Sequence, residues 1–261
     1  MNHLPKSEFI SHLVRINKLN ACDFARFIFF QGMMFGSEKK WWGTKGLRGS
    51  LHEGLDLCFF ENACHEYFRL DETVKVPMLY DGRVEHITDD FLGKTVITSH
   101  FFDDPDQPSL LSLYGHLNPD KNLKIGDEIK EGQVFARISG FKKQIAGFKK
   151  RIAGLENSKK SLLPHLHISL ARPEMLPPAT HLEWEFLNSV DRSVFIDPLN
   201  VISPQYTIIE YDDGLDVSKL FVCVSSRMKR RNLLCMRKFI GNKGWVSLRS
   251  AQNRNRTFRS N

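Results

Sequence analysis

Apolar residues near the amino terminus recur at the spacing of an amphipathic helix. Within residues 6–35, the positions that share one helical face are Phe9, Ile10, Leu13, Ile16 and Leu19. Ser7 and Glu8 precede most of this series and suit the first turn of a helix. The pattern predicts one or two amphipathic helices in a helical amino-terminal segment, residues 1–44.

From about residue 46 to residue 202 the pattern changes to short runs that are typical of strands. The stretch VKVPMLYDGRVEHI (74–87) has Asp81-Gly82 between apolar-rich arms, which predicts a β-hairpin. The segments KTVITSHFF, LLSLYGHL and IKEGQVFARIS follow as further short strands. Helices do not alternate with these strands, so we expect a mainly β fold built on an antiparallel β-sheet.

A basic repeat interrupts the β-like region. FKKQIAG is followed directly by FKKRIAG over residues 141–154, and the apolar positions are spaced as one helical seam, with lysines on the other side. We expect a basic helical insertion at 141–160. The favoured interpretation is a short surface helix that packs on its own domain, and the alternative is a basic amphipathic helix that contacts anionic polymers or membrane surfaces.

Composition narrows the class of protein. A chain of 261 residues with 41% hydrophobic residues is long enough for one large globular domain or a medium domain with appendages. No run of about 18 apolar residues occurs, so no transmembrane segment is predicted. The amino terminus lacks the pattern of a secretory signal. The five cysteines form no C-x-x-C pair, which argues against a disulfide framework and a cysteine zinc knuckle.

The net charge of +7 comes from the carboxy-terminal part of the chain. From Val217 onward there are 12 Lys and Arg and no Asp or Glu, whereas residues 1–216 carry 25 basic and 30 acidic groups. This basic extension, which we place at 204–261, could bind phosphate polymers electrostatically. It has no recognisable nucleic-acid module, so a specific nucleic-acid partner is not predicted.

Three short motifs carry residues that suit metal chemistry. They are HEGLD with His52 and Asp56, YGHL with His116, and PHLHISL with His165 and His167. In a strand, residues an even number apart point to the same side, so both pairs can address one centre. Gly54, between His52 and Asp56, leaves room for a close approach.

Zinc accepts imidazole nitrogen and carboxylate oxygen, and a catalytic zinc site uses three protein ligands. Two histidines and one aspartate meet that number, which leaves two histidines to move protons or to stabilise charge. The helical motif H-E-x-x-H is absent, so a histidine, with an ordinary pKa of about 6.5, would have to act as the base.

Taken together, the motifs resemble those of the lysostaphin-type (LytM-like) zinc metallopeptidases, which cut peptide cross-bridges in bacterial murein. HEGLD matches the family's H-x-G-x-D, YGHL matches its Y-G/A-H-L, and PHLH matches its P-H-L-H, in the family's order. KIGDEIKEGQVFARISG and IDPLNVI are similar to two further segments of the family. The resemblance covers residues 45–203 and implies a peptidase domain there.

The resemblance implies a role for each of these residues. His52, Asp56 and His167 would bind one Zn²⁺ per chain, and His116 and His165 would form the catalytic pair. The implied fold is an antiparallel sheet with the metal in an open groove. The implied activity is a zinc metalloendopeptidase that acts on peptidoglycan or another flexible peptide, in the periplasm, at the cell envelope or outside the cell. The alternative is a catalytically silent module of the same fold that binds murein or regulates a partner.

The chain departs from the family just before PHLH. The family commonly has a short loop there that is rich in glycine and threonine, whereas this chain has the basic repeat and LENSKKSLL. Because that loop borders the groove in the family, the choice of substrate does not follow from the resemblance. Trp41, Trp42 and Phe35 suit either a substrate groove or internal packing.

Overall fold

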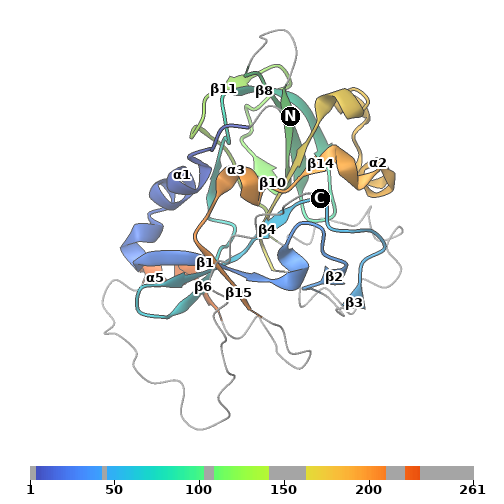
Figure 1. Ribbon diagram of the computed structural model, residues 1–261. Helices are drawn as coiled ribbons and strands as arrows, with labels where there is room; N and C mark the ends of the chain where they lie inside the picture. Colours follow the sequence, from blue (N-terminus) through green and yellow to red (C-terminus); the bar gives the residue numbers. More distant parts are fainter. Residues whose placement is uncertain (1–3, 43–45, 103–108, 141–162, 210–220, 230–261) are drawn as a thin grey trace.

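The computed structural model describes residues 4–42, 46–102, 109–140, 163–209 and 221–229 (Figure 1). The protein is mainly β, and most of its strand pairs are antiparallel, which confirms the predicted fold class. Two predictions lie outside the described residues: the basic helical insertion at 141–160 and the greater part of the basic tail.

Among the described residues, the larger sheet has nine strands, and it occupies the upper part of Figure 1. Six strands follow one another in the order β11-β8-β9-β10-β12-β7, and β13 pairs with β10, β14 and β4. The strands are β4 (Leu55–Leu57), β7 (Lys75–Pro77), β8 (Gly82–Asp89), β9 (Lys94–His100), β10 (Leu110–Pro119), β11 (Glu128–Ile129), β12 (Val134–Ile138), β13 (Leu166–Ala171) and β14 (Phe195–Ile196).

A smaller sheet lies below it in the order β15-β1-β5-β6-β16. The pairs β1·β15 and β6·β16 are parallel, and the other two pairs are antiparallel. Its strands are β1 (Phe24–Phe30), β5 (Phe59–Asn62), β6 (Tyr67–Arg69), β15 (Tyr206–Ile209) and β16 (Val222–Cys223). The short strands β2 (Lys39–Lys40) and β3 (Gly46–Leu47) pair separately.

The helices are short. The α-helices are α1 (Phe9–Ile16), α2 (Trp184–Ser189), α3 (Leu199–Ile202) and α5 (Val224–Lys229). The 3-10 helices are η1 (Leu19–Cys22), η2 (Gln31–Met33), η4 (Pro173–Met175), η5 (Ala179–His181) and η6 (Arg192–Val194). In the part of the chain that the structure describes, none of the helices has the length and apolar character needed to span a membrane.

Of the one or two helices predicted for the amino-terminal segment, the structure contains one α-helix among the residues that it describes. The first helix forms as α1, whose buried side chains are Phe9, Leu13 and Val14. The following apolar run, FARFIFF, is the strand β1 and not a second helix. A strand that is buried on both faces reads as a continuous apolar run, which periodicity cannot distinguish from a buried helix. Here β1 lies between β5 and β15, and the aromatic-rich composition suits a strand.

The predicted hairpin at 74–87 is wrong in its pairing. Both arms are strands, but β7 pairs with β12, and β8 pairs with β9 and β11. The Asp81 carboxylate accepts the Glu131 backbone N–H at 2.8 Å and contacts Lys130 Nζ at 2.9 Å, which ties this turn to the neighbouring loop. Gly82 is needed for close packing, since a Cβ there would lie 2.3 Å from the Ser99 carbonyl oxygen.

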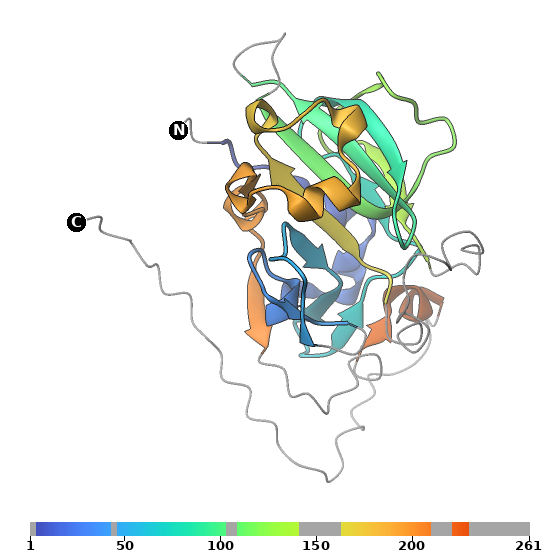
Figure 2. The ribbon, with the colours of Figure 1, turned by 90° about the vertical axis from the view of Figure 1, so that its right-hand side faces the viewer.

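Side chains alternate between the two faces of the larger sheet, and each face carries its own hydrophobic cluster. On β10, Leu110 and Tyr114 belong to a cluster that reaches into the smaller sheet, whereas Leu111 and Leu113 belong to a second cluster on the other face. Leu187 of α2 covers that second cluster, and Figure 2 shows the gold and orange helical segments lying over the green strands.

The predicted domain boundaries stay predictions. β1 comes from the predicted amino-terminal segment and β15 from the predicted carboxy-terminal extension, and they pair along Phe27–Phe30 and Tyr206–Ile209. The two ends of the described chain therefore meet in one sheet.

Candidate metal centre

Two neighbouring strands bring the HEGLD and PHLH motifs together. Asp56 on β4 is paired in register with His167 on β13. Gly54 permits this approach, because a Cβ there would lie 2.4 Å from the Ile168 carbonyl oxygen and 2.8 Å from His167 Cε1. His52 comes from the segment just before β4 and is 1% exposed. The glycine therefore has the role that the motif predicts for it.

His52, Asp56 and His167 present three ligand atoms to one point. His52 Nε2 lies 3.3 Å from His167 Nδ1 and 3.4 Å from Asp56 Oδ1, and the latter two atoms are 2.8 Å apart. Ligands at about 2.0–2.1 Å from a tetrahedral zinc ion lie ~3.3–3.4 Å from one another. Two of the three separations have that value and the third is shorter, so the donor atoms and their spacing fit a zinc ion.

The other ring nitrogen of each candidate histidine ligand has its own partner. His52 Nδ1 lies 3.0 Å from the Met34 carbonyl oxygen, to which it can only donate. His167 Nε2 lies 2.8 Å from Ser169 Oγ and 3.2 Å from Glu53 Oε1. Such contacts fix the tautomer and the orientation of metal-binding histidines. In both rings the other nitrogen then faces the cluster, and a metal ion that bound His167 there would displace the proton that Nδ1 shares with Asp56.

The Asp56 carboxylate is also held from its far side. Trp41 Nε1–H donates to Asp56 Oδ2 at 2.6 Å, and Arg48 Nη2 lies 3.7 Å from the same oxygen. Trp41 is buried, and its ring stands edge-on to His165 at 5.1 Å. Trp41 is thus a packing residue that supports the site, whereas Trp42 lines the cavity. Of the two roles that the sequence suggested, Trp41 has internal packing and Trp42 has a place in the groove.

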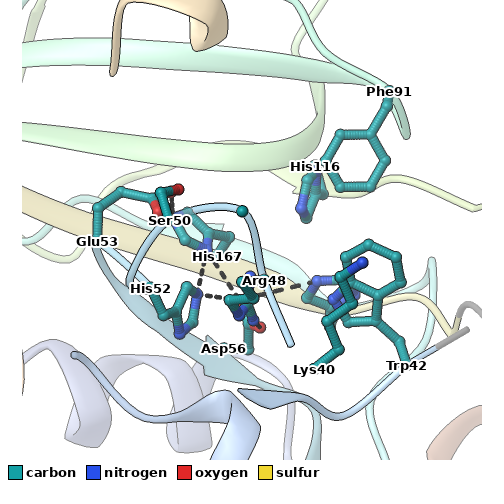
Figure 3. A pocket seen from close by; sticks show the side chains of 12 residues that line it. Lys40, Trp42, Arg48, Ser50, His52, Glu53, Asp56, Phe91, His116 and His167 are labelled. Atoms are coloured by element: carbon teal, nitrogen blue, oxygen red, sulfur yellow. Dashed lines mark hydrogen bonds and ion pairs between the residues drawn. The ribbon is translucent and has the colours of Figure 1, made fainter. Parts of the chain in front are cut away.

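His116 and His165 lie beside this cluster, and their ring centroids are 4.7 Å apart. Figure 3 shows His116 next to Phe91. His165 immediately precedes β13, and its Nδ1 lies 2.7 Å from the Leu163 carbonyl oxygen, so Nδ1 carries the proton. His116 lies in β10 where the register with β9 shifts, and its φ is +63°. A histidine with positive φ is uncommon and is typical of functional sites.

Burial and close charges shift the pKa values of the site. Burial lowers the pKa of His165 to about 3, so its imidazole is neutral at physiological pH. Burial would also lower the pKa of His167, but hydrogen bonds with Asp56 and Glu53 prevail and raise it to about 9. Burial opposes ionisation of Glu53 as well, yet His167 holds its pKa at about 2. The site therefore combines an ionised carboxylate with one imidazole whose pKa is lowered, that of His165, and one whose pKa is raised, that of His167.

A cavity of about 240 Å³ opens over these residues. His52, Asp56, His116, His165 and His167 all line it. Apart from the acidic Glu53, the remaining lining residues are basic, aromatic or small, namely Lys40, Trp42, Arg48, Gly49, Ser50 and Phe91. The arrangement can hold a cation beside two imidazoles, within reach of a small part of a larger molecule.

All five site residues predicted from the motifs come together in this cavity. The described histidines outside the motifs, namely His12, His65, His86, His100 and His181, do not line it. Sequence reasoning missed Glu53, although it lies inside HEGLD, because no spacing rule identified a partner for it. Arg48 and Asp90 were also missed, since each lies outside the motifs. The sequence named Trp41 only as a residue that suits a substrate groove or internal packing, and not as a partner of Asp56.

The sequence matches no known protein family and no curated protein in these comparisons. Among solved structures, the chain matches the catalytic domain of the antimicrobial peptidase lysostaphin from Staphylococcus simulans, with 19% identity, a TM-score of 0.37 and coverage of 70% of this chain and 92% of that chain. It also matches a catalytic-domain variant of the prophage-encoded protein EnpA from Enterococcus faecalis, with 20% identity, a TM-score of 0.32 and coverage of 67% and 95%.

The complex of SpoIIQ and SpoIIIAH, described as pore-forming, is matched with 17% identity, a TM-score of 0.36 and coverage of 70% of this chain and 87% of that chain. The matched structures thus include lysostaphin-type peptidase domains, the family that the motifs resemble. Because the sequence identities and TM-scores are this low, any conclusion about function rests on the residues and geometry of the site.

Proposed function

We propose that the protein is a zinc-dependent metalloendopeptidase that hydrolyses peptide bonds, with peptidoglycan cross-links as its substrate. One observation carries the proposal: three ligand atoms that fit a zinc ion and two further imidazoles line the same cavity. Folding stability does not explain a buried cluster of four histidines and an aspartate, because burying charged groups costs free energy.

His52, Asp56 and His167 would hold the ion through Nε2, Oδ1 and Nδ1. When bound, zinc supplies a Lewis acid that polarises a carbonyl group and lowers the pKa of water. His165 carries its proton on Nδ1, where it donates to the Leu163 carbonyl oxygen, so its Nε2 can accept a proton from the attacking water. His116, 4.7 Å away between ring centroids, would act with His165 in moving protons to and from the reacting groups.

The size of the cavity and the resemblance of the motifs to those of murein endopeptidases support the proposed kind of peptide. A cavity of about 240 Å³ admits only a short section of chain at the cluster. An extended, flexible peptide can enter such a site without unfolding, as the peptide bridges of murein can. This supports murein peptides over folded proteins as substrate.

The test combines zinc analysis with a cleavage assay on purified peptidoglycan and on oligoglycine. We expect one zinc per chain in the parent protein, loss of zinc in His52→Ala, and retained zinc with at least ~100-fold slower cleavage in His116→Ala and His165→Ala. Absence of bound zinc, or parental cleavage by both catalytic variants, would contradict the proposal. Zinc binding and murein retention without any cleavage would instead favour the catalytically silent module.

A further inference from the structure

The unusual backbone of His116 depends on a neighbouring turn. Positive φ at this position, within the irregular part of β10, turns the His116 N–H toward Asp90, whose Oδ2 accepts it at 2.7 Å. On the other side, the His116 carbonyl oxygen accepts the Ser139 N–H at 2.7 Å. Asp90 lies in the turn between β8 and β9, so the backbone of this histidine is fixed from outside its own strand.

The same carboxylate also reaches the imidazole. Asp90 Oδ1 lies 3.3 Å from His116 Nδ1, while the next residue in the turn, Phe91, packs edge-on against the ring with centroids 4.5 Å apart. Asp90 is only 6% exposed. Burial opposes its ionisation, but His116 and nearby backbone N–H groups hold its pKa well below the usual range. It is therefore an ionised carboxylate within ion-pair distance of the imidazole, on the side of Nδ1.

Asp90 is itself held rigidly. Its Oδ1 accepts the backbone N–H groups of Leu92 and Gly93, each at 2.7 Å, and its Oδ2 accepts the Thr95 hydroxyl at 3.0 Å. Gly93 fits closely, because a Cβ there would lie 2.5 Å from the Leu117 carbonyl oxygen. A carboxylate with this many donors cannot rotate away from His116 without leaving buried N–H groups unpaired.

We infer that Asp90 is a positioning residue for His116: it keeps the imidazole proton on Nδ1 and thereby presents Nε2, on the far side of the ring, to the reacting groups. The inference rests on the proposed function for its catalytic consequence only, because the tautomer of His116 is a property of the protein alone. Carboxylate partners of this kind orient catalytic histidines and fix their tautomers in other enzymes.

Asp71 provides a matched control. It is also a buried aspartate in a turn, and it accepts the Thr73 N–H and hydroxyl through Oδ1 and the Ser225 N–H through Oδ2, but no histidine. Asp71→Asn and Asp90→Asn thus remove the same charge from the same kind of turn. Only Asp90→Asn removes it from beside an imidazole.

The test is histidine-selective ¹⁵N NMR on the zinc-loaded full chain at mildly alkaline pH, with the His116 signal identified by its loss in His116→Ala. We expect the Nδ1–H tautomer in the parent protein and in Asp71→Asn, and a mixture or the Nε2–H tautomer in Asp90→Asn. On murein peptides, kcat of Asp90→Asn should fall about 10- to 100-fold, which is part of the ~10²–10⁴-fold that general acid–base catalysis contributes, while zinc content stays unchanged.

The outcomes separate the two proposals. A parent protein whose His116 carries its proton on Nε2 would overturn the positioning role even if Asp90→Asn did not fold. An Asp90→Asn protein with the parental tautomer and the kcat of Asp71→Asn would reduce Asp90 to a turn residue. If the parent protein cleaves no peptide but Asp90→Asn changes the tautomer, the peptidase proposal fails and the positioning role stands.

Discussion

At the scale of single residues, Glu53 has the clearest testable role. It is buried, its Oε1 lies 3.2 Å from His167 Nε2, and its Oε2 lies 3.9 Å from Arg192 Nη1. We expect Glu53→Gln to weaken zinc binding about 10-fold, because loss of the charge makes His167 a poorer ligand and partners of this kind contribute 10- to 100-fold to metal affinity. Competition with a chromogenic chelator measures the effect.

Ser169→Ala is the matched control, since Ser169 Oγ contacts the same nitrogen at 2.8 Å without a charge. We expect it to weaken zinc binding less than Glu53→Gln does. Equal affinities in the parent protein and Glu53→Gln would show that Ser169 alone orients His167.

His100 makes stability depend on pH in a definite direction. It is fully buried, its Nε2 lies 2.6 Å from Ser112 Oγ, and burial lowers its pKa from 6.5 to about 4. Between these pKa values the unfolded chain binds a proton that the folded chain does not. The free energy of unfolding therefore falls as pH falls through this window, by on the order of 3 kcal/mol at most.

Urea unfolding at several pH values tests this, with His100→Gln for comparison. The variant should be less stable at neutral pH, because it loses the ring's hydrogen bonds, but its stability should change less between neutral pH and about pH 4.5. Parallel pH profiles for the two proteins would contradict the prediction.

The sequence identified the residues of the candidate centre better than the residues that hold them in position. His52, Asp56, His116, His165 and His167 stand in compact motifs whose even spacing predicted pairs on one side of a strand. The residues do meet, although His52 and His165 lie before β4 and β13 and not within them. Asp90 stands 26 residues before His116 and has no motif of its own. Its role depends on a local irregularity of β10, and local pattern does not encode which turn will lie against an irregular strand.

At the scale of elements, the pattern of apolar and polar residues predicted where strands form but not which strands pair. β9, β10 and β12 form where short runs rich in branched and apolar residues predicted them. The Asp81-Gly82 pair failed as a hairpin signal because the Asp81 side chain binds the Lys130–Glu131 loop. Such a contact joins segments about fifty residues apart, beyond the reach of a turn rule.

Gly54 should control the fit between β4 and β13. In Gly54→Ala the new Cβ would lie 2.4 Å from the Ile168 carbonyl oxygen, so the strands must separate. We expect a loss of about 1–3 kcal/mol in the free energy of unfolding, as for other overpacked sites, together with weaker zinc binding. Denaturant titration and zinc competition measure the two effects.

Gly49→Ala is the control for this change, because Gly49 also lines the cavity but a Cβ there meets no atom within 4 Å. It should leave both quantities near those of the parent. If Gly54→Ala behaved in the same way as Gly49→Ala, the strands would not need the glycine.

At the scale of the whole molecule, part of the carboxy-terminal segment packs against the rest of the protein. Phe221 and Val224 are 6% and 1% exposed, and β15 pairs with β1. Ending the chain after residue 203 should therefore lower the free energy of unfolding by about 3 kcal/mol or more, since burying one such side chain contributes about 1.5–3 kcal/mol.

Ending the chain after residue 229 removes none of the described contacts. This shorter truncation should retain the thermal unfolding midpoint and the zinc content of the parent, and any binding to polyanions that depends on residues 230–261 should disappear. Equal stability of the two truncated chains would show that β15, Phe221 and Val224 add little to the fold.

The pairing of β4 with β13 also has a consequence in time. Asp56 and His167 are 111 residues apart in the chain, and β1 meets β15 across an even longer interval. A growing polypeptide that has reached residue 160 contains His52, Asp56 and His116 but neither His165 nor His167. Contacts between such distant segments form slowly. The ribosome therefore has to make the chain as far as His167 before all the residues of the candidate metal centre are present.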